Sequence, residues 1–233
     1  YYTINDFNAD DAKHKTWTLK EGVVKINGYN PQPGDVKFKD LRTDGVINAG
    51  DNTVDNPGDR KIIGNDAARY QFGISLGASY KGWSLEVLLQ GVGKRDYWLG
   101  GPAMFPFGGA GAGDAVFQAL YANQTDYWRA KSYDPSSSDY MVPVNPDSKL
   151  FRIYDQGNNV GSNTRVSDKY LQNAAYMRIK NITLAYTLPK EWVRRAFIQD
   201  AKFYLSIENL ATFSSLPKGY DPEGTAPSST ANA

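Results

Sequence analysis

The clearest pattern along the chain is an alternation of apolar and small or polar residues in the segment "RYQFGISLGASYKGWSLEVLLQGVG". From Tyr70 to Tyr80, every second residue is apolar or aromatic, which is the period of a strand with one apolar face. A second run begins at Trp83 after the two residues "KG", a link of hairpin length whose glycine can adopt a positive φ. The pattern therefore predicts an antiparallel hairpin over residues 70–93.

The register of this hairpin follows from its short link. If Tyr80 faces Trp83, apolar pairs fall on one side and small or polar pairs on the other. The expected apolar pairs are Ala78 with Leu85, Leu76 with Val87 and Ile74 with Leu89, opposite to the pairs Ser79 with Ser84 and Gly77 with Glu86. A β-sandwich hairpin also alternates in this way. Strands of about ten residues and an aromatic pair beside the turn favour a transmembrane β-barrel, whose aromatic residues gather at the membrane interfaces.

Two more strands are predicted over residues 173–188 and 201–210. The segment "PKEWVRRAFIQD" between them predicts a short helix that begins after Pro189, with Trp192 and Phe197 available for packing.

The alternation in the first of these strands is imperfect, because two cations share a face with apolar residues. The residues on this face are Tyr176, Arg178, Lys180, Ile182, Leu184 and Tyr186. Either a bulge shifts the pattern or the outer half of the strand rises beyond the lipid. In both cases Arg178 and Lys180 should avoid hydrocarbon, where a cation costs about 2–4 kcal/mol. We expect them to line the lumen beside Glu86 and to balance its charge.

The remaining segments are long and rich in Gly, Pro, Ser, Asp and Asn. The predicted organisation is an extracellular loop region at 1–69, a barrel hairpin at 70–93, an extracellular loop at 94–172, a strand pair with a short periplasmic helical turn at 173–210, and an extracellular loop at 211–233 that leads to a missing final strand. Outer-membrane barrels alternate tight periplasmic turns with long external loops in this way. Loops of such length are usually functional.

Composition narrows the function classes. The 233 residues include 16 Tyr, 5 Trp, 10 Phe and 22 Gly, which suits an all-β protein. The chain has no cysteine and one histidine, which excludes disulfides, thiol catalysis and His-rich metal sites. A net charge of +1 gives no reason to expect a nucleic-acid partner. No pair of carboxylates is marked out for glycoside hydrolysis, so we expect no enzyme activity.

One segment, "KDLRTDGVINAGD", resembles half of a calcium-binding loop. The residues at the ligand positions of an EF-hand-type loop are Asp40, Asp44, Val46 and Asp51. Gly45 supplies the sharp bend, but Arg42 stands where an oxygen ligand is needed and would repel the ion. Two interpretations stay open: a calcium site completed by water or Asn48, and a rigid Asp-Gly turn.

Several aromatic residues of the loops could stack on sugar rings, with Asp126 or Arg129 bonding to hydroxyl groups. The candidate ligand-binding aromatics are Tyr97, Trp98, Phe105, Phe107, Tyr121, Tyr127, Trp128 and Tyr133. The alternative is that they pack the loop itself or the interface with a partner, where Tyr and Trp are also enriched.

Six motifs in a fixed order carry a family resemblance: "PGDVKFKDLRTDGVIN", "RKIIGN", "YKGWSLEVLLQGVG", "YLQNAAYMRIKNITLAYTLP", "YLSIENL" and "GYDPE". The chain resembles the C-terminal part of the SusC/RagA family of TonB-dependent outer-membrane transporters from Bacteroidota. Family members usually carry Asn or Asp at the position of Arg42. The barrel of this family has about 22 strands, of which this chain would supply about four or five.

The resemblance also implies an internal plug and import of oligosaccharides or oligopeptides across the outer membrane, energised by TonB through an N-terminal part outside this chain. A SusD-like surface lipoprotein would close the extracellular mouth. The rival interpretation is a secreted, calcium-stabilised β-sandwich that binds carbohydrate. A sandwich would bury the apolar hairpin face against a second sheet, whereas a barrel would expose it to lipid.

Overall fold

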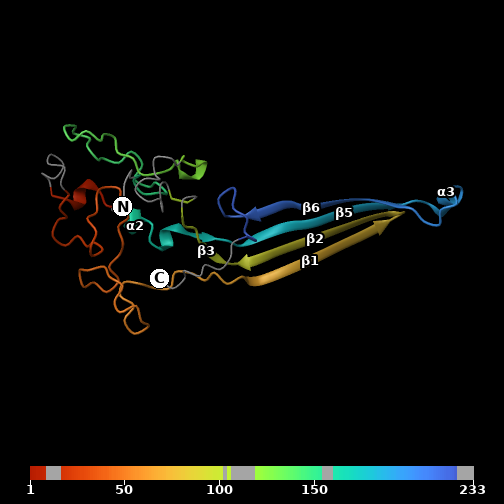
Figure 1. Ribbon diagram of the computed structural model, residues 1–233, viewed down its shortest axis with the longest axis horizontal. Helices are drawn as coiled ribbons and strands as arrows, with labels where there is room; N and C mark the ends of the chain where they lie inside the picture. The colour runs from red at the N-terminus through yellow and green to blue at the C-terminus, as the bar shows by residue number, and fades with distance from the viewer. Residues whose placement is uncertain (9–16, 102–103, 106–118, 154–159, 225–233) are drawn as a thin grey trace. The chain divides into compact units, whose positions relative to one another are not determined.

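A computed structural model describes residues 1–8, 17–101, 104–105, 119–153 and 160–224. The chain divides into two compact units, drawn in Figure 1. The first unit comprises Tyr1–Ile63 and Leu99–Ser167, and the second comprises Gly64–Trp98 and Asp168–Ala233. No helix among the described residues is long and apolar enough to cross a membrane.

The second unit contains a four-stranded antiparallel sheet in the order β1-β2-β5-β6 (Figure 1). Its strands are β1 (Arg69–Tyr80), β2 (Trp83–Lys94), β5 (Tyr176–Thr187) and β6 (Lys202–Ser214). A smaller sheet pairs β3 (Asp96–Trp98) with β4 (Leu171–Asn173), and the unit also contains η4 (Asp168–Tyr170) and α3 (Lys190–Arg194). The prediction of an all-β chain is confirmed. The described sheet is open at β1 and β6, so it is not a closed barrel.

The predicted hairpin register is confirmed. Tyr80 pairs with Trp83, and the apolar pairs follow as expected. Lys81 and Gly82 close the hairpin with φ angles of 46° and 87°, the two positive values that a type I′ turn requires. This turn has the same twist as the strands that it joins, which explains why two residues suffice.

Cross-strand pairing aligns the apolar side chains of all four strands into rows. The rows are Tyr80, Trp83, Tyr186 and Phe203; Ala78, Leu85, Leu184 and Leu205; Leu76, Val87, Ile182 and Ile207; and Ile74, Leu89, Ile179 and Ala211. The opposite face carries small and polar rows: Gly77, Glu86, Thr183 and Ser206; and Gly73, Gln90, Arg178 and Thr212. The sheet is therefore amphipathic across its whole width.

A β-bulge at Lys180 explains the imperfect alternation of β5. Leu88 pairs with Asn181 and Leu89 pairs with Ile179, so Lys180 is the extra residue that has no pairing partner on β2. The bulge restores the pattern because it moves Ile179 onto the apolar face. Of the two explanations that the sequence left open, the bulge is the one observed.

The helical turn between β5 and β6 also differs in one respect from expectation. Helix α3 begins after Pro189, as predicted. Packing by Trp192 and Phe197 was expected, but the former is 62% exposed and the latter fully exposed, whereas Val193 is buried. That expectation is wrong, because the short helix turns Val193 inward and leaves both aromatic rings outside.

The described residues of the first unit contain little regular structure. The elements among them are η1 (Ile4–Asp6), η3 (Ala122–Gln124) and α2 (Val160–Asn163). Isolated bridges join distant segments, among them Ile26 with Ile47 and Tyr127 with Leu150. Two stretches predicted as separate loops, before residue 64 and after residue 98, thus form one compact unit.

Candidate functional site

The polar face of the sheet carries a cluster of charges around Arg178. This side chain is buried, and its Nε donates to Thr212 Oγ1 at 2.7 Å. Its Nη2 lies 2.5 Å from Asp221 Oδ1 and its Nη1 lies 2.8 Å from Glu223 Oε2. Lys180 Nζ contacts the same Glu223 carboxylate at 3.2 Å. Two cations of β5 therefore hold the turn that follows β6.

Backbone contacts reinforce this cluster. The backbone N–H of Glu223 donates to Asp221 Oδ1 at 3.0 Å, and this bond together with the one from Arg178 lowers the pKa of the Asp221 carboxyl. The Asp221 carboxylate consequently stays ionised opposite the cations at neutral pH. The cluster neutralises charge on the polar face and ties a loop to the strands.

Arg178 and Lys180 avoid the apolar face, as predicted, but their partners are not the expected ones. Glu86 faces Thr183 on the neighbouring strand, in a row different from that of Arg178. The partner carboxylates lie instead in the motif "GYDPE", which the sequence offered only as one of the motifs of the family resemblance. The sequence did contain a signal for these two carboxylates. In an antiparallel pair the end of β6 lies opposite the start of β5, so the residues that follow β6 lie close to Arg178.

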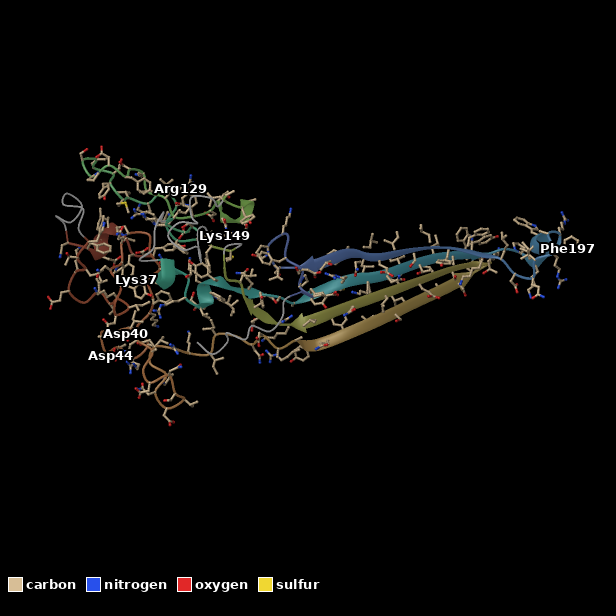
Figure 2. All side chains as sticks on the ribbon, viewed as in Figure 1. Lys37, Asp40, Asp44, Arg129, Lys149 and Phe197 are labelled. Atoms are coloured by element: carbon tan, nitrogen blue, oxygen red, sulfur yellow. The ribbon has the colours of Figure 1, made fainter. Side chains whose placement is uncertain are left out.

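The segment that resembles a calcium loop forms a network of turns, and Asp40 and Asp44 are labelled in Figure 2. Asp40 accepts hydrogen bonds from the backbone N–H groups of Thr43, at 2.7 Å, and Gly45, at 2.8 Å. Asp44 Oδ2 lies 2.9 Å from Arg42 Nη2. Both carboxylates thus serve the turn itself.

The other two predicted calcium ligands also have protein partners. The carbonyl oxygen of Val46 accepts from Asn48 Nδ2 at 3.4 Å, and Asp51 Oδ2 accepts from Asn56 Nδ2 at 2.8 Å. Within the described part of the chain, no three His, Cys, Asp or Glu side chains are grouped so that they could hold a metal ion. Calcium binding in this loop stays a prediction.

The candidate aromatic residues fall into different environments. Trp128 and Phe105 are buried; Trp128 packs with Ala130 and Met141, and the Phe105 ring lies 6.0 Å from that of Phe151. Buried rings of this kind pack the first unit and offer no surface to a ligand.

The others retain some exposure. Tyr97 and Trp98 lie half-buried in β3, and Tyr121 and Tyr133 are exposed. Tyr127 is half-buried beneath the guanidinium of the exposed Arg129, which lies 5.9 Å from the ring centroid. Phe107 lies outside the described residues.

An open groove of the first unit was not predicted from the sequence. It measures about 770 Å³ and is lined by Trp17, Lys20, Lys25, Asn27, Asn30 and Gln32 among others. An aromatic ring beside amide and ammonium groups can bind hydroxyl or carboxylate groups. Trp17 also stacks on Tyr140 at 5.9 Å and packs against the buried cluster of Trp128, Ala130 and Met141, so it has a structural role as well.

Comparisons with known proteins give partial matches. No family model matches the chain. It is 26% identical over 204 residues to TonB-dependent receptor P3 of Formosa agariphila, and 23% identical over 211 residues to TonB-dependent receptor P26 of the same organism. These alignments cover 87% and 90% of this chain, and 17% and 18% of the respective relatives.

The chain is similar to TonB-dependent receptors over most of its length. This similarity confirms the resemblance inferred from the ordered motifs, and it agrees with the expectation that the chain is not an enzyme. The chain spans less than a fifth of the length of these curated relatives. Among solved structures, the RagAB peptide importer in its open-open state is 25% identical, with 66% of this chain and 14% of that chain covered at a TM-score of 0.38.

Proposed function

We propose that this chain forms part of the wall and the external loops of a TonB-dependent importer in the outer membrane. The four aligned apolar rows carry the proposal. Their side chains lie on one face of a sheet with strands of 12 or 13 residues, and large members such as Leu205 (64% exposed) and Leu76 (56% exposed) are uncovered. Lipid would cover such a face in a barrel.

The position of the aromatic row supports the same orientation. Tyr80, Trp83, Tyr186 and Phe203 form the row next to the hairpin turn, and the rings of Trp83 and Tyr186 lie 4.7 Å apart. Outer-membrane barrels carry aromatic girdles where the strands leave the hydrocarbon. This end of the sheet carries only short connections, the two-residue turn and the α3 turn, so we assign it to the periplasm.

The polar rows would face the lumen, with Arg178 neutralised there by two carboxylates. Charged groups are tolerated inside a wet barrel but not on its lipid face. In this arrangement, the rival β-sandwich is disfavoured because the apolar rows are exposed in the described residues rather than buried under a second sheet.

The partners and the substrate class follow from the resemblance and belong to the proposal. We expect a SusD-like surface lipoprotein over the extracellular loops, coupling to TonB through parts of the protein outside this chain, and an oligosaccharide or oligopeptide as substrate. The open groove beside Trp17 and the exposed Arg129 above the half-buried Tyr127 are the candidate contacts in this unit.

A pair of arginine substitutions in β6 tests the barrel. Ile207 lies in an apolar row and its neighbour Glu208 projects from the opposite face at the same depth. Ile207→Arg should reduce the amount of folded full-length protein in outer membranes severalfold, because a lipid-facing arginine near the midplane costs about 2–4 kcal/mol. Glu208→Arg should be tolerated. Equal assembly of both variants, or a full-length protein that is soluble without detergent, would contradict a lipid-facing sheet.

Co-purification tests the partner separately. The full-length protein extracted from outer membranes in mild detergent should carry a surface lipoprotein, and native mass spectrometry of the complex should distinguish a bound oligosaccharide from an oligopeptide. A folded barrel that is isolated alone would leave the membrane assignment intact and refute the lipoprotein partner.

A further inference from the structure

The loop that resembles a calcium site has a large excess of negative charge. Between residues 40 and 59 it contains five aspartates, and Arg42 is the only basic residue. Acidic loops of this kind fold around a cation, because their carboxylates otherwise repel one another. A positive charge within the loop would reduce this repulsion.

The guanidinium of Arg42 contacts three oxygen atoms from separate parts of the loop. Its Nη2 lies 2.9 Å from Asp44 Oδ2 and donates to Asn48 Oδ1 at 3.1 Å, while Nη1 donates to Asn56 Oδ1 at 3.4 Å. A planar group with five donors can bind several oxygens in this way, which the ammonium of lysine cannot do with the same geometry. The side chain thus gathers a carboxylate and two amides around one positive charge.

The same contacts show how a calcium ion would fit this loop. Asn48 is the residue that would replace the missing ligand, but its Oδ1 accepts from Arg42 and from the backbone N–H of Gly50, at 2.7 Å. Asp44, the ligand at the fifth position, pairs with the same guanidinium. A calcium ion in this loop would therefore lie beside the Arg42 guanidinium and would compete with it for two ligands, Asp44 and Asn48.

Another acidic residue closes the network from outside the twelve-residue pattern. The carboxylate of Asp59 accepts from the backbone N–H groups of Leu41 and Asn48, both at 2.9 Å, and from that of Arg42 at 3.3 Å. The last residues of the loop also pack tightly against its middle, since a Cβ on Gly58 would lie 2.3 Å from the backbone nitrogen of Gly50. Protein groups thus close the loop.

We propose that the guanidinium of Arg42 replaces calcium in this loop, so that the segment folds around a side-chain cation and does not depend on metal. The acidic loop keeps its shape while the arginine provides the charge that an ion provides in an EF-hand-type loop. The inference concerns the first unit alone and does not depend on the transport function.

Hydrogen exchange of the full-length protein tests this proposal at the loop itself. Deuterium uptake of peptides that cover residues 40–59 would be measured in EGTA and in calcium chloride, for the native protein and for Arg42→Asn. The substitution removes the guanidinium and introduces an oxygen at the third ligand position. Arg60→Asn is the matched control, because Arg60 belongs to the same segment but donates to Asn52 instead of this set of oxygens.

We expect the native loop to exchange at the same rate in both solutions. Arg42→Asn should exchange about tenfold faster in EGTA, since several charge-assisted bonds are lost, and calcium should slow it again. Arg60→Asn should behave like the native protein in both solutions. Faster exchange of the native loop in EGTA would overturn the proposal, and so would an Arg42→Asn loop that keeps the native rate there.

Discussion

Arg178 and Arg42 are both cations held by oxygen atoms, but their burial differs. The Arg178 side chain is 8% exposed, whereas that of Arg42 is 36% exposed. An exposed ion pair contributes little to stability on its own, whereas removing one member of a buried pair leaves a charge without compensation. Arg178 should therefore matter for global stability and Arg42 for local order.

Replacing Arg178 by leucine tests the first of these roles. Arg178→Leu deletes the bonds to Thr212, Asp221 and Glu223, so we expect the free energy of unfolding to fall by about 1.5–3 kcal/mol. The measurement is the urea midpoint of the full-length protein in detergent. The control is Arg195→Leu in the turn after α3, where the side chain is exposed. Equal midpoints for the two variants would show that the cluster does not stabilise the fold.

Asp59 gives a prediction about pH. Partial burial alone would raise its pKa, but hydrogen bonds from the backbone N–H groups of Asn48, Leu41 and Arg42 outweigh it and lower the pKa below 3.8. A lowered folded pKa means that the carboxylate stabilises the loop above pH 3.8 and that this contribution is lost as the pH falls through the lower folded value. Asp59→Asn removes the contribution at every pH.

The measurable quantity is the difference in loop protection between the native protein and Asp59→Asn. Corrected for intrinsic exchange rates, this difference should be largest above pH 5 and should shrink as the pH is lowered toward about 3. A difference that stays constant over this range would contradict the assigned pKa shift.

At the scale of elements, the hairpin turn depends on one glycine. Gly82 has a φ of 87°, and a Cβ there would lie 2.9 Å from the carbonyl oxygen of Thr187. Gly82→Ala should cost about 1–2 kcal/mol for the left-handed backbone alone, and it should lower the yield of folded, heat-modifiable protein. Gly77→Ala is the control, since its added Cβ would meet nothing within 4 Å. If both substitutions reduced the yield equally, turn geometry would not be the cause.

The strands also show what a sequence can predict. The alternation from Tyr70 to Tyr80 and the two-residue link determined the register of β1 and β2, because a shift by one residue would move every side chain to the opposite face. The same sensitivity made β5 ambiguous. A single extra residue, Lys180, exchanges the two faces, and only pairing with β2 and β6 locates it.

At the scale of the whole molecule, the folded structure of the first unit is the part that the sequence predicts least well. Its shape depends on contacts between distant residues, such as the hydrogen bond of 2.7 Å from the backbone N–H of Val36 to Asn163 Oδ1. Gly34 likewise lies against Trp128, where a Cβ would approach the indole ring to 2.6 Å. No local periodicity encodes such pairs, so the sequence offers Trp128 as a candidate ligand contact although the side chain is buried.

The orientation of the chain in the membrane can be tested with its own connections. The chain lacks cysteine, so single cysteines introduced into a full-length protein without other accessible thiols report their location. Phe197 lies in the α3 turn, labelled in Figure 2, and is fully exposed; Val54 is 96% exposed in a segment predicted to be extracellular. In intact cells, a membrane-impermeant maleimide should label Val54→Cys but not Phe197→Cys. Permeabilisation of the outer membrane should make Phe197→Cys reactive. The reverse order of labelling would invert the proposed topology, because three strands of the sheet, β1, β2 and β5, separate the two positions along the chain.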